Sequence, residues 1–381
     1  MSSLYIHFPF CQQKCSYCGF YSIARVSLIS DFVSALKREI RLQAPLWLSA
    51  PFKTLYFGGG TPSMLPPVVL QELIDEVSEV YGLAEDAEIT LEANPNHLTE
   101  SYFQSLRQTR INRLSIGVQS FFDEDLRRIR RMHTGRQAEQ AMELADRYGF
   151  RNLSVDLMYG LPDSSLSRWK ANLQKVASVP HLSCYQLTLE EGTLLYRQQR
   201  QGTLSLPDEE EVEAQYRCLM EFATAHSFRQ YEISNFCKGE AYSRHNRSYW
   251  RDEPYAGFGP GAHAYTGDFR QYNVPDVSRY IQILSRLSTP EEWKEQLHYL
   301  YERECLTQDM KYNEYVMTSL RTCWGCDLSY LRNRFGDEYE KHLRMQLRRI
   351  AAQHYLLAAD RLRLTPSGMR FADGIAATLF V

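Results

Sequence analysis

The sequence lacks any window of about 18 uncharged apolar residues, the length that a membrane-spanning helix needs. It also lacks a basic N-terminal segment followed by an apolar stretch, the pattern of a secretory signal peptide. Neither sign of charge dominates, since 43 Lys and Arg stand against 46 Asp and Glu and the formal net charge is −3. Such a balance gives no long-range field that favours nucleic acid or an anionic membrane. We therefore expect a soluble, cytoplasmic protein with no nucleic-acid partner and no transmembrane segment.

Cysteine is scarce, with nine residues in 381, and the odd number does not suit a disulfide framework. In a reducing compartment these residues are expected to be thiols or metal ligands. Three of them, Cys11, Cys15 and Cys18, nevertheless fall close together, and no fourth cysteine lies near them in the sequence. The hydrophobic fraction of 44% and the charged fraction of 23% are those of a folded globular protein, which excludes a disordered or fibrous chain.

Strand and helix patterns alternate through the first three quarters of the chain. The clearest helical pattern, at residues 66–82, has Leu70, Leu73, Ile74, Val77 and Tyr81 on one face. About six alternations imply βαβ units and a parallel sheet. The strands are predicted at residues 4–8, 54–57, 88–91, 113–118, 152–158, 182–187 and 230–234.

Two of the expected strands are polar on one face and apolar on the other. In residues 113–119 the polar side chains occupy alternate positions, and residues 153–157 follow the same rule. An open doubly wound sheet needs two apolar faces, whereas a barrel that holds a polar ligand needs one of each kind. Too few units occur for a complete eightfold barrel. The fold class expected is therefore α/β, a partial (β/α)6 TIM-like barrel over residues 1–285, with its site at the carboxyl ends of the strands.

The alternation stops after residue 285. Residues 290–306, 311–322 and 328–353 have helical patterns, and residues 354–366 have the pattern of a short hairpin. We expect residues 286–381 to form a smaller, mainly helical or winged-helix-like C-terminal domain.

The three clustered cysteines have the spacing C-x3-C-x2-C, directly after the first expected strand. Thiolates select zinc, copper(I) or iron-sulfur clusters. Structural zinc nearly always takes four protein ligands, and a fourth ligand such as His7 would have a spacing unusual for a zinc finger. A [4Fe-4S] cluster bound by three thiolates leaves one iron for a chelating substrate, such as the amino and carboxylate groups of S-adenosylmethionine. The alternatives are a zinc site and three cysteines buried as small apolar side chains.

Several ordered motifs resemble those of the radical S-adenosylmethionine superfamily, and the resemblance to its branch of coproporphyrinogen oxidases and HemW-like proteins covers essentially the whole chain. They are the cysteine motif itself and the segments GGGTPS at 58–63, EANP at 92–95, SIGVQSF at 115–121, DLMYGLP at 156–162 and YQL at 185–187. The resemblance implies a [4Fe-4S] cluster on Cys11, Cys15 and Cys18, with S-adenosylmethionine beside it and an electron donor for the cluster.

The resemblance also places Gly59, Gly60 and Thr61 at the methionine amino group of S-adenosylmethionine. Taken alone, these residues form only a glycine-rich turn after a strand, without the lysine of a phosphate loop. Tyr5, on the first expected strand, is implied to pack near the cluster.

Three polar residues, Glu92, Gln119 and Asp156, stand at or near the carboxyl ends of three different expected strands. Buried carboxylates need donors, and ribose hydroxyls and the methionine ammonium group are such donors. The resemblance places all three at the cofactor, together with Arg131, whose guanidinium suits the methionine carboxylate. Taken alone, Arg131 is equally consistent with a solvated charge on a helix.

Two features separate this chain from the oxidases of that branch. The oxidases carry a further cysteine two positions after the third one, where this chain has Phe20, and a long N-terminal extension, where only ten residues precede Cys11. The segment RHNRSYW resembles the HNxxYW segment of HemW-like proteins, which implies that His245 binds haem iron and that Tyr249 or Trp250 covers the porphyrin. Taken alone, a single loop histidine is more often a hydrogen-bonded structural residue.

The function expected is that of a haem chaperone, which binds haem and delivers it to acceptor haemoproteins, and whether the chain is also an enzyme stays open. The alternatives are an oxygen-independent coproporphyrinogen III oxidase, which decarboxylates porphyrinogen propionates, and another radical enzyme with a different substrate. Cys323 and Cys326 form a C-W-G-C segment without a second half of a zinc site nearby, so we expect them to pack in a core. His263, in a glycine-rich turn, is expected to support the site.

Overall fold

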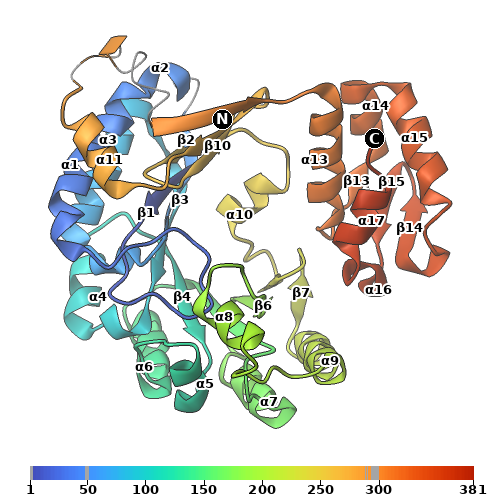
Figure 1. The fold of residues 1–381 in the computed structure, drawn as a ribbon, viewed down its shortest axis with the longest axis horizontal. Coiled ribbons are helices and arrows are strands. Elements are labelled where there is room, and N and C mark those ends of the chain that lie inside the picture. The colour runs from blue at the N-terminus through green and yellow to red at the C-terminus, as the bar shows by residue number, and fades with distance from the viewer. Residues whose placement is uncertain (1–2, 48–50, 288, 290, 293–299) are drawn as a thin grey trace.

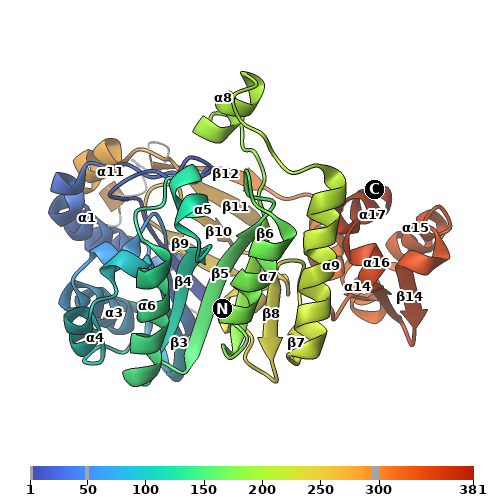
Figure 2. The same ribbon diagram turned by 90° about the horizontal axis from the view of Figure 1, so that it is seen from below.

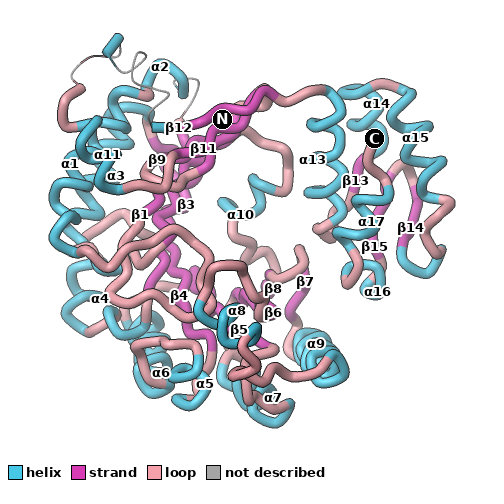
Figure 3. Tube along the Cα trace, viewed as in Figure 1, coloured by secondary structure: helices cyan, strands magenta, loops and turns pink. Residues whose placement is uncertain are grey.

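The computed structural model describes residues 3–47, 51–287, 289, 291–292 and 300–381. A curved sheet of twelve strands runs through the larger part of it (Figure 3). Six strands lie side by side in chain order, and each is parallel to its neighbours. They are β1 Ser3–Phe8, β2 Phe52–Gly59, β3 Leu83–Ala93, β4 Arg113–Gln119, β5 Asn152–Tyr159 and β6 His181–Gln186.

Helices follow these strands and cover the convex face of the sheet (Figure 1). In α3 the buried face includes Leu70, Leu73 and Val77, the helix begins at Pro67, whose ring fixes φ, and it ends before Gly82 with φ 75°. The helix predicted from this pattern is therefore confirmed. The main helices are α1 Ile29–Leu42, α3 Pro67–Tyr81, α4 Glu100–Leu106, α6 Gly135–Arg147, α7 Leu166–Lys175 and α9 Glu209–Ala225. Shorter ones are α2 Ala44–Trp47, α5 Asp123–Arg128 and α8 Leu194–Arg200.

The two faces of the parallel strands differ as the sequence predicts. Leu114, Ile116 and Val118 of β4 are buried in the core beneath the helices. The alternate residues face the concave side, which we call the lumen, and there Ser115 donates a hydrogen bond to Asp156 of β5. The predicted α/β partial barrel, with its smaller C-terminal domain, is confirmed.

Further strands extend both edges of the sheet. On one side β9 Tyr255–Phe258 is parallel to β1, and β10 His263–Tyr265, β11 Phe269–Asn273 and β12 Tyr301–Cys305 follow it in antiparallel order. On the other side β8 Asn235–Lys238 and β7 Phe228–Gln230 follow β6. The helices α10 Arg244–Tyr249 and α11 Val277–Leu284 lie in this part of the chain.

Of the seventh strand predicted at residues 230–234, only Gln230 lies in a strand, at the end of β7. Residues 231–234 form the turn between β7 and β8, in which the Tyr231 amide donates to the Asn235 carbonyl oxygen at 3.0 Å. The Glu232 carboxylate accepts from the Ser234 amide at 3.0 Å, so a side chain provides the hydrogen bond that a strand partner would have provided.

The helix predicted at residues 290–306 is confirmed at residues 291, 292 and 300 and is wrong at residues 301–305. Residues 290 and 293–299 lie outside the described residues, and Tyr301–Cys305 form β12, paired with β11. The charged residues here have good helix propensity, but pairing with an exposed sheet edge overrides it. The domain boundary between residues 285 and 286 stays a prediction, although this pairing places residues 301–305 with the barrel.

The C-terminal part has its own hydrophobic core, which includes Tyr312, Leu331 and Leu362. The predicted helix at 311–322 and the predicted hairpin are confirmed, whereas Gly336, with φ 105°, divides the stretch 328–353 into two helices. The elements are α13 Gln308–Leu320, α14 Leu328–Phe335, α15 Asp337–Leu347, α16 Pro366–Met369, α17 Ala372–Thr378, β13 Cys326–Asp327, β14 Tyr355–Ala358 and β15 Arg361–Leu364.

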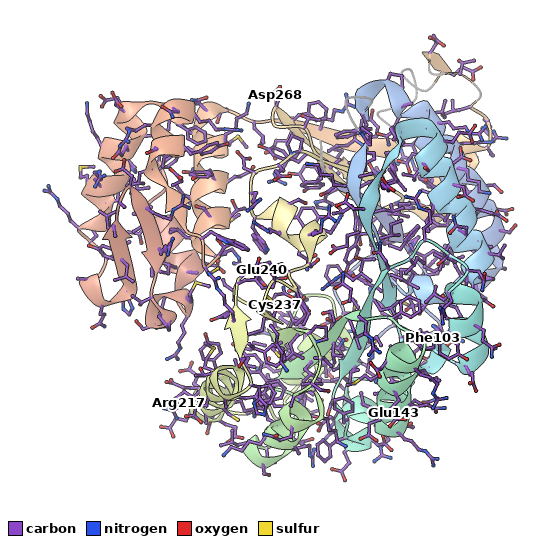
Figure 4. The ribbon with its side chains drawn as sticks, turned by 180° about the vertical axis from the view of Figure 1, so that it is seen from behind. Phe103, Glu143, Arg217, Cys237, Glu240 and Asp268 are labelled. Carbon is purple, nitrogen blue, oxygen red and sulfur yellow. The ribbon has the colours of Figure 1, made fainter. Side chains whose placement is uncertain are left out.

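This C-terminal domain lies across the open side of the barrel (Figure 1). Asp268, in the turn between β10 and β11, accepts from Lys311 Nζ at 2.8 Å, and Figure 4 shows it beside the C-terminal domain. At the other end of the contact, the Cys323 amide donates to the Tyr231 carbonyl oxygen at 2.9 Å. In the described part of the chain, none of the helices combines the length and apolarity required to cross a bilayer.

Candidate functional site

The loop that carries the three cysteines lies at the carboxyl end of β1 and is fixed by backbone hydrogen bonds. The Cys11 amide donates to the Ile23 carbonyl oxygen at 3.0 Å, and the Ser16 amide donates to that of Ile129 at 3.1 Å. The Ser16 carbonyl oxygen accepts from the Leu195 amide of α8 at 2.9 Å, and α8 projects beyond the end of the sheet (Figure 2). The fold therefore positions the loop at the mouth of the lumen.

The three predicted ligands, Cys11, Cys15 and Cys18, lie within electrostatic reach of one another. Burial raises the pKa of the Cys18 thiol, and the charges of Cys15 and Cys11 raise it further. Within the described ranges, no three His, Cys, Asp or Glu side chains gather closely enough to share a single metal ion. Soft thiolates such as these are ligands of zinc and of iron-sulfur clusters.

Two other predicted residues donate hydrogen bonds to these thiols. Thr61 Oγ1 lies 3.5 Å from Cys11 Sγ, and Arg131 Nη1 lies 3.6 Å from Cys15 Sγ. Hydrogen bonds to ligand sulfur atoms tune the potential of an iron-sulfur cluster. The structure thus brings the glycine-rich turn and the arginine to the cysteine loop.

The glycine-rich turn after β2 is shaped by its neighbours. Gly59 has φ 104°, which favours glycine, and its amide donates to the Glu92 carboxylate at 3.2 Å. A Cβ atom at Gly60 would overlap the carbonyl oxygen of Phe10. Gly60 is therefore required by the approach of the chain that leads into the cysteine loop, and Gly59 is required by its backbone conformation and by the nearby ring of His7, whatever ligand binds at the turn.

The two predicted carboxylates share the lumen. Glu92 also accepts from the Tyr56 hydroxyl at 2.9 Å, and Asp156 accepts from Ser115 at 3.2 Å. Burial raises the pKa of Glu92 to about 7, and the nearby charge of Asp156 acts in the same direction. Burial likewise raises the pKa of Asp156 to about 6. Near neutral pH both groups can accept hydrogen bonds from ammonium or hydroxyl donors.

Arg131 and Gln119 carry polar atoms that the protein leaves unpaired. Arg131 Nη2 donates to Asn94 Oδ1 at 3.2 Å and to the Gly117 carbonyl oxygen. In the described structure, the Nε atom of Arg131 and the Oε1 atom of Gln119 are buried without a hydrogen-bond partner. Gln119 has φ 66°, at a bulge where the pairing of β4 with β5 shifts. Strained backbone and unpaired buried atoms in one place are typical of a ligand site. With the carboxylates and thiols, this donor set fits a cluster and S-adenosylmethionine.

Tyr5 lies deeper in the lumen than the cysteine loop. Its ring stacks on Tyr56 with centroids 6.0 Å apart, and its hydroxyl lies 3.2 Å from His7 Nδ1. Burial raises the pKa of Tyr5, and the charge of Glu92 adds to the effect. The structure therefore places Tyr5 beside the lumen carboxylate.

Sequence reasoning missed Tyr56, Asn94 and His133. Asn94 Oδ1 accepts from Arg131 and lies 3.0 Å from His133 Nδ1. The motifs contained a signal for each, because Asn94 stands inside EANP, Tyr56 lies on the lumen face two positions before Gly58, and His133 follows Arg131 by two positions.

His245 lies toward the opposite end of the lumen from the cysteines, in the helix α10 rather than in a loop. Its Nδ1 pairs with the Thr54 hydroxyl of β2 at 2.8 Å, and its Nε2 pairs with the Tyr249 hydroxyl at 2.8 Å. The side chain is 1% exposed, and burial lowers its pKa to about 3, so the imidazole is neutral. Since both ring nitrogens have partners, Nε2 can bind iron only after the Tyr249 hydroxyl moves away.

The remaining residues singled out from the sequence have other surroundings. Cys326 is buried in the C-terminal core, and Cys323 Sγ accepts from Arg229 Nη2 at 3.3 Å. Figure 4 shows Cys237, which belongs to the same hydrophobic cluster as Cys323, where the barrel meets the C-terminal domain. His263 lies on β10, and its ring packs edge-on against the ring of Tyr272, with the ring centroids 4.9 Å apart. None of these side chains reaches the cysteine loop through a described hydrogen bond.

Comparison with known proteins agrees with this geometry. The pattern of the radical SAM superfamily matches residues 5–176, and that of the HemN C-terminal domain matches residues 306–371. The chain is 34% identical to the heme chaperone HemW of Bacillus subtilis, over 90% of this chain and 88% of that protein. It is 40% identical to the heme chaperone HemW of Escherichia coli, over 68% and 69%. Its fold is similar to that of the coproporphyrinogen III oxidase HemN of Escherichia coli, with a TM-score of 0.83, 23% identity and coverage of 100% and 90%.

Proposed function

Because the chain belongs to the HemW family of the radical SAM superfamily, we propose that it is a haem chaperone, which binds haem and delivers it to acceptor haemoproteins. The observation that carries the proposal is its identity of 34% to a heme chaperone HemW over nearly the full length of both proteins. Phe20, in place of the further cysteine of the oxidases, supports the same conclusion.

We further propose that Cys11, Cys15 and Cys18 hold a [4Fe-4S] cluster. When bound with S-adenosylmethionine, such a cluster supplies one-electron chemistry. Thr61 and Arg131 support this assignment, because their side chains already donate to two of the three thiols. We also propose that an electron donor reduces this cluster.

The proposed S-adenosylmethionine site lies between the glycine-rich turn and the ends of β3, β4 and β5. Glu92 and Asp156 act as acceptors for the ammonium and ribose groups, and Arg131 pairs with the carboxylate. Support comes from the unpaired buried atoms of Arg131 and Gln119. Gly59, Gly60 and Thr61 bring the backbone close to the ligand, and Tyr5 packs beside it.

Ligation of haem iron by His245 stays a prediction of the resemblance. It requires that the Tyr249 hydroxyl leave Nε2, which it now holds at 2.8 Å. Because the imidazole is neutral, protonation is no obstacle.

Anaerobically reconstituted protein tests the proposed function. Haemin titration, protoporphyrinogen formation from coproporphyrinogen III, and transfer of bound haem to an apo-haemoprotein are measured on the same preparation. We expect haem binding and transfer without protoporphyrinogen formation. Efficient decarboxylation together with a failure to retain haem would replace the chaperone with the oxidase.

A further inference from the structure

A groove of about 910 Å³ separates the barrel from the C-terminal domain. One wall consists of the ends of β5 and β6 and the first turns of α9, and the other consists of α16 and the start of α17. Its volume is within the range of pockets that enclose a ligand of several hundred daltons. The groove is separate from the floor of the lumen where His245 lies.

Aromatic side chains stand on both walls of this groove. Tyr185 and Tyr216 belong to the barrel side, and Phe371 belongs to the C-terminal domain. Phe371 is 54% exposed and Tyr185 is 41% exposed. Met369 and Val212 add apolar surface. Two facing apolar walls with partly exposed rings suit a flat, largely apolar ligand.

The groove also carries two arginines. Arg370 bonds both oxygens of Glu213 at 3.1 Å across the groove, and Arg321 pairs with Asp373. These carboxylates lie on the surface, where an ion pair contributes little and can be exchanged for another. Arg321 Nε is buried without a partner in the described structure, so this guanidinium has a donor left over. Two arginines beside apolar walls complement a flat ligand with two carboxylates.

One side chain connects the groove with the lumen. The side chain of Tyr185 lines the groove. Burial raises the pKa of the Tyr185 hydroxyl, and the charges of the nearby Asp156 and Glu232 carboxylates raise this pKa further. A planar ligand in the groove therefore has one edge next to the proposed S-adenosylmethionine site. Haem has this combination of a flat apolar plane and two carboxylates.

We propose that this groove binds haem, with the porphyrin face between Tyr185 and Phe371 and the propionates on Arg321 and Arg370. The proposal rests on the proposed chaperone function and names the site at which haem is held. It differs from ligation by His245, because it uses the plane and the carboxylates of the porphyrin and does not require α10 to rearrange.

Three groove variants and two control variants test the groove proposal. Phe371→Ser and Arg370→Glu change two exposed groove residues, and Leu356→Ser and Arg348→Glu change exposed residues of the same domain outside it. In haemin titrations of the reconstituted protein, we expect the first pair to weaken binding at least tenfold and the second pair to leave it unchanged. Cluster iron content and circular dichroism, measured on each variant, establish that the fold is intact. Val212→Trp, which fills the groove without changing charge, should weaken binding as well.

Metal-free protoporphyrin IX and its dimethyl ester separate the two haem sites. We expect the metal-free porphyrin to compete with haemin and the dimethyl ester to compete at least tenfold less well. If the groove variants bind like their controls while His245→Ala loses binding, the groove proposal is overturned and the chaperone function stands. If the wild-type protein itself binds no haemin, the proposed function is overturned.

Discussion

The three cysteines of the loop differ from the other six in their surroundings, and this difference makes their role testable. Replacement of Cys11, Cys15 or Cys18 by Ser removes a soft ligand from a site that offers only three. We expect each variant to lose the broad visible absorbance of an iron-sulfur cluster after anaerobic reconstitution. Cys305→Ser changes an exposed cysteine on β12 and serves as the control, because its cluster spectrum should match that of the wild type. An intact spectrum in any loop variant would remove that residue from the ligand set.

Glu92 makes the affinity for S-adenosylmethionine depend on pH. Its pKa of about 7 means that about one-tenth of the carboxylate is ionised at pH 6 and most of it at pH 7.5. Since the ionised form accepts from the ligand, affinity should rise with pH by roughly tenfold over this interval. Glu92→Gln should bind weakly and with a flatter pH profile, measured by calorimetry on the cluster-loaded protein. The control Glu72→Gln, an exposed partner of Lys37, should keep the wild-type profile. Equal profiles for wild type and Glu92→Gln would place the ligand elsewhere.

At the scale of single residues, the sequence predicts the positions in the motifs well but says little about their partners. Cys11 follows the end of β1 and Glu92 lies near the end of β3, as expected. Asp156 lies within β5 on the lumen face, because period-two alternation fixes which face each residue of a strand occupies. His245 is a residue whose hydrogen-bond partners the sequence alone does not predict. Its two partners come from β2 and from the next turn of its own helix, and only the three-dimensional arrangement shows that both nitrogens are used.

At the scale of elements, the six parallel strands could be predicted and the additional edge strands could not. The core strands have continuous buried apolar faces, whereas β12 has the sequence YEREC, with one buried residue followed by four exposed ones. Such a strand forms because the edge of β11 offers hydrogen-bonding groups, and this information is absent from the local sequence. The same reason explains the misplaced strand at residues 230–234.

One buried carboxylate joins α1 to the added strands. Glu39 accepts four hydrogen bonds: from Gln43 at 2.7 Å, from Asn273 of β11 at 3.2 Å, from the Gly259 amide at 2.7 Å and from the hydroxyl of Tyr280 of α11 at 2.6 Å. A glutamine offers fewer acceptor sites, so Glu39→Gln leaves at least one buried donor unpaired, and we expect it to lower the free energy of unfolding by about 1–3 kcal/mol. Urea unfolding followed by circular dichroism measures this loss.

The loss should depend on pH in a direction that the pKa of Glu39 determines. Burial raises this pKa to about 7, above its value in the unfolded chain, so the group stabilises the fold fully below about pH 4.5 and loses this contribution as pH rises through 7. Because glutamine does not titrate, the difference between wild type and Glu39→Gln should be larger at pH 5.5 than at pH 8. Glu72→Gln, on the surface of α3, should show almost no loss at either pH. A loss that is independent of pH would contradict the raised pKa.

At the scale of the whole molecule, the C-terminal domain forms one wall of the groove, so its docking should determine haem affinity. Asp252 connects the two parts: it accepts from Tyr265 of β10 at 2.6 Å and from Tyr330 of α14 at 3.3 Å, and it pairs with Arg334 at 3.0 Å. This carboxylate is nearly buried and has φ 55°, a conformation that asparagine tolerates well. Asp252→Asn therefore removes the charge without straining the backbone.

We expect Asp252→Asn to weaken the docking by about 1.5–3 kcal/mol, the range for hydrogen bonds to a charged group. Hydrogen exchange should become faster at the amides of α14 that face the barrel, while the amides of the parallel strands keep their protection. The matched control is Asp146→Asn, which removes an exposed carboxylate from α6, far from the groove. Because the groove needs both walls, haemin affinity should fall in Asp252→Asn and not in the control. Faster exchange without any loss of haemin affinity would mean that haem is held by the barrel alone, as ligation by His245 requires.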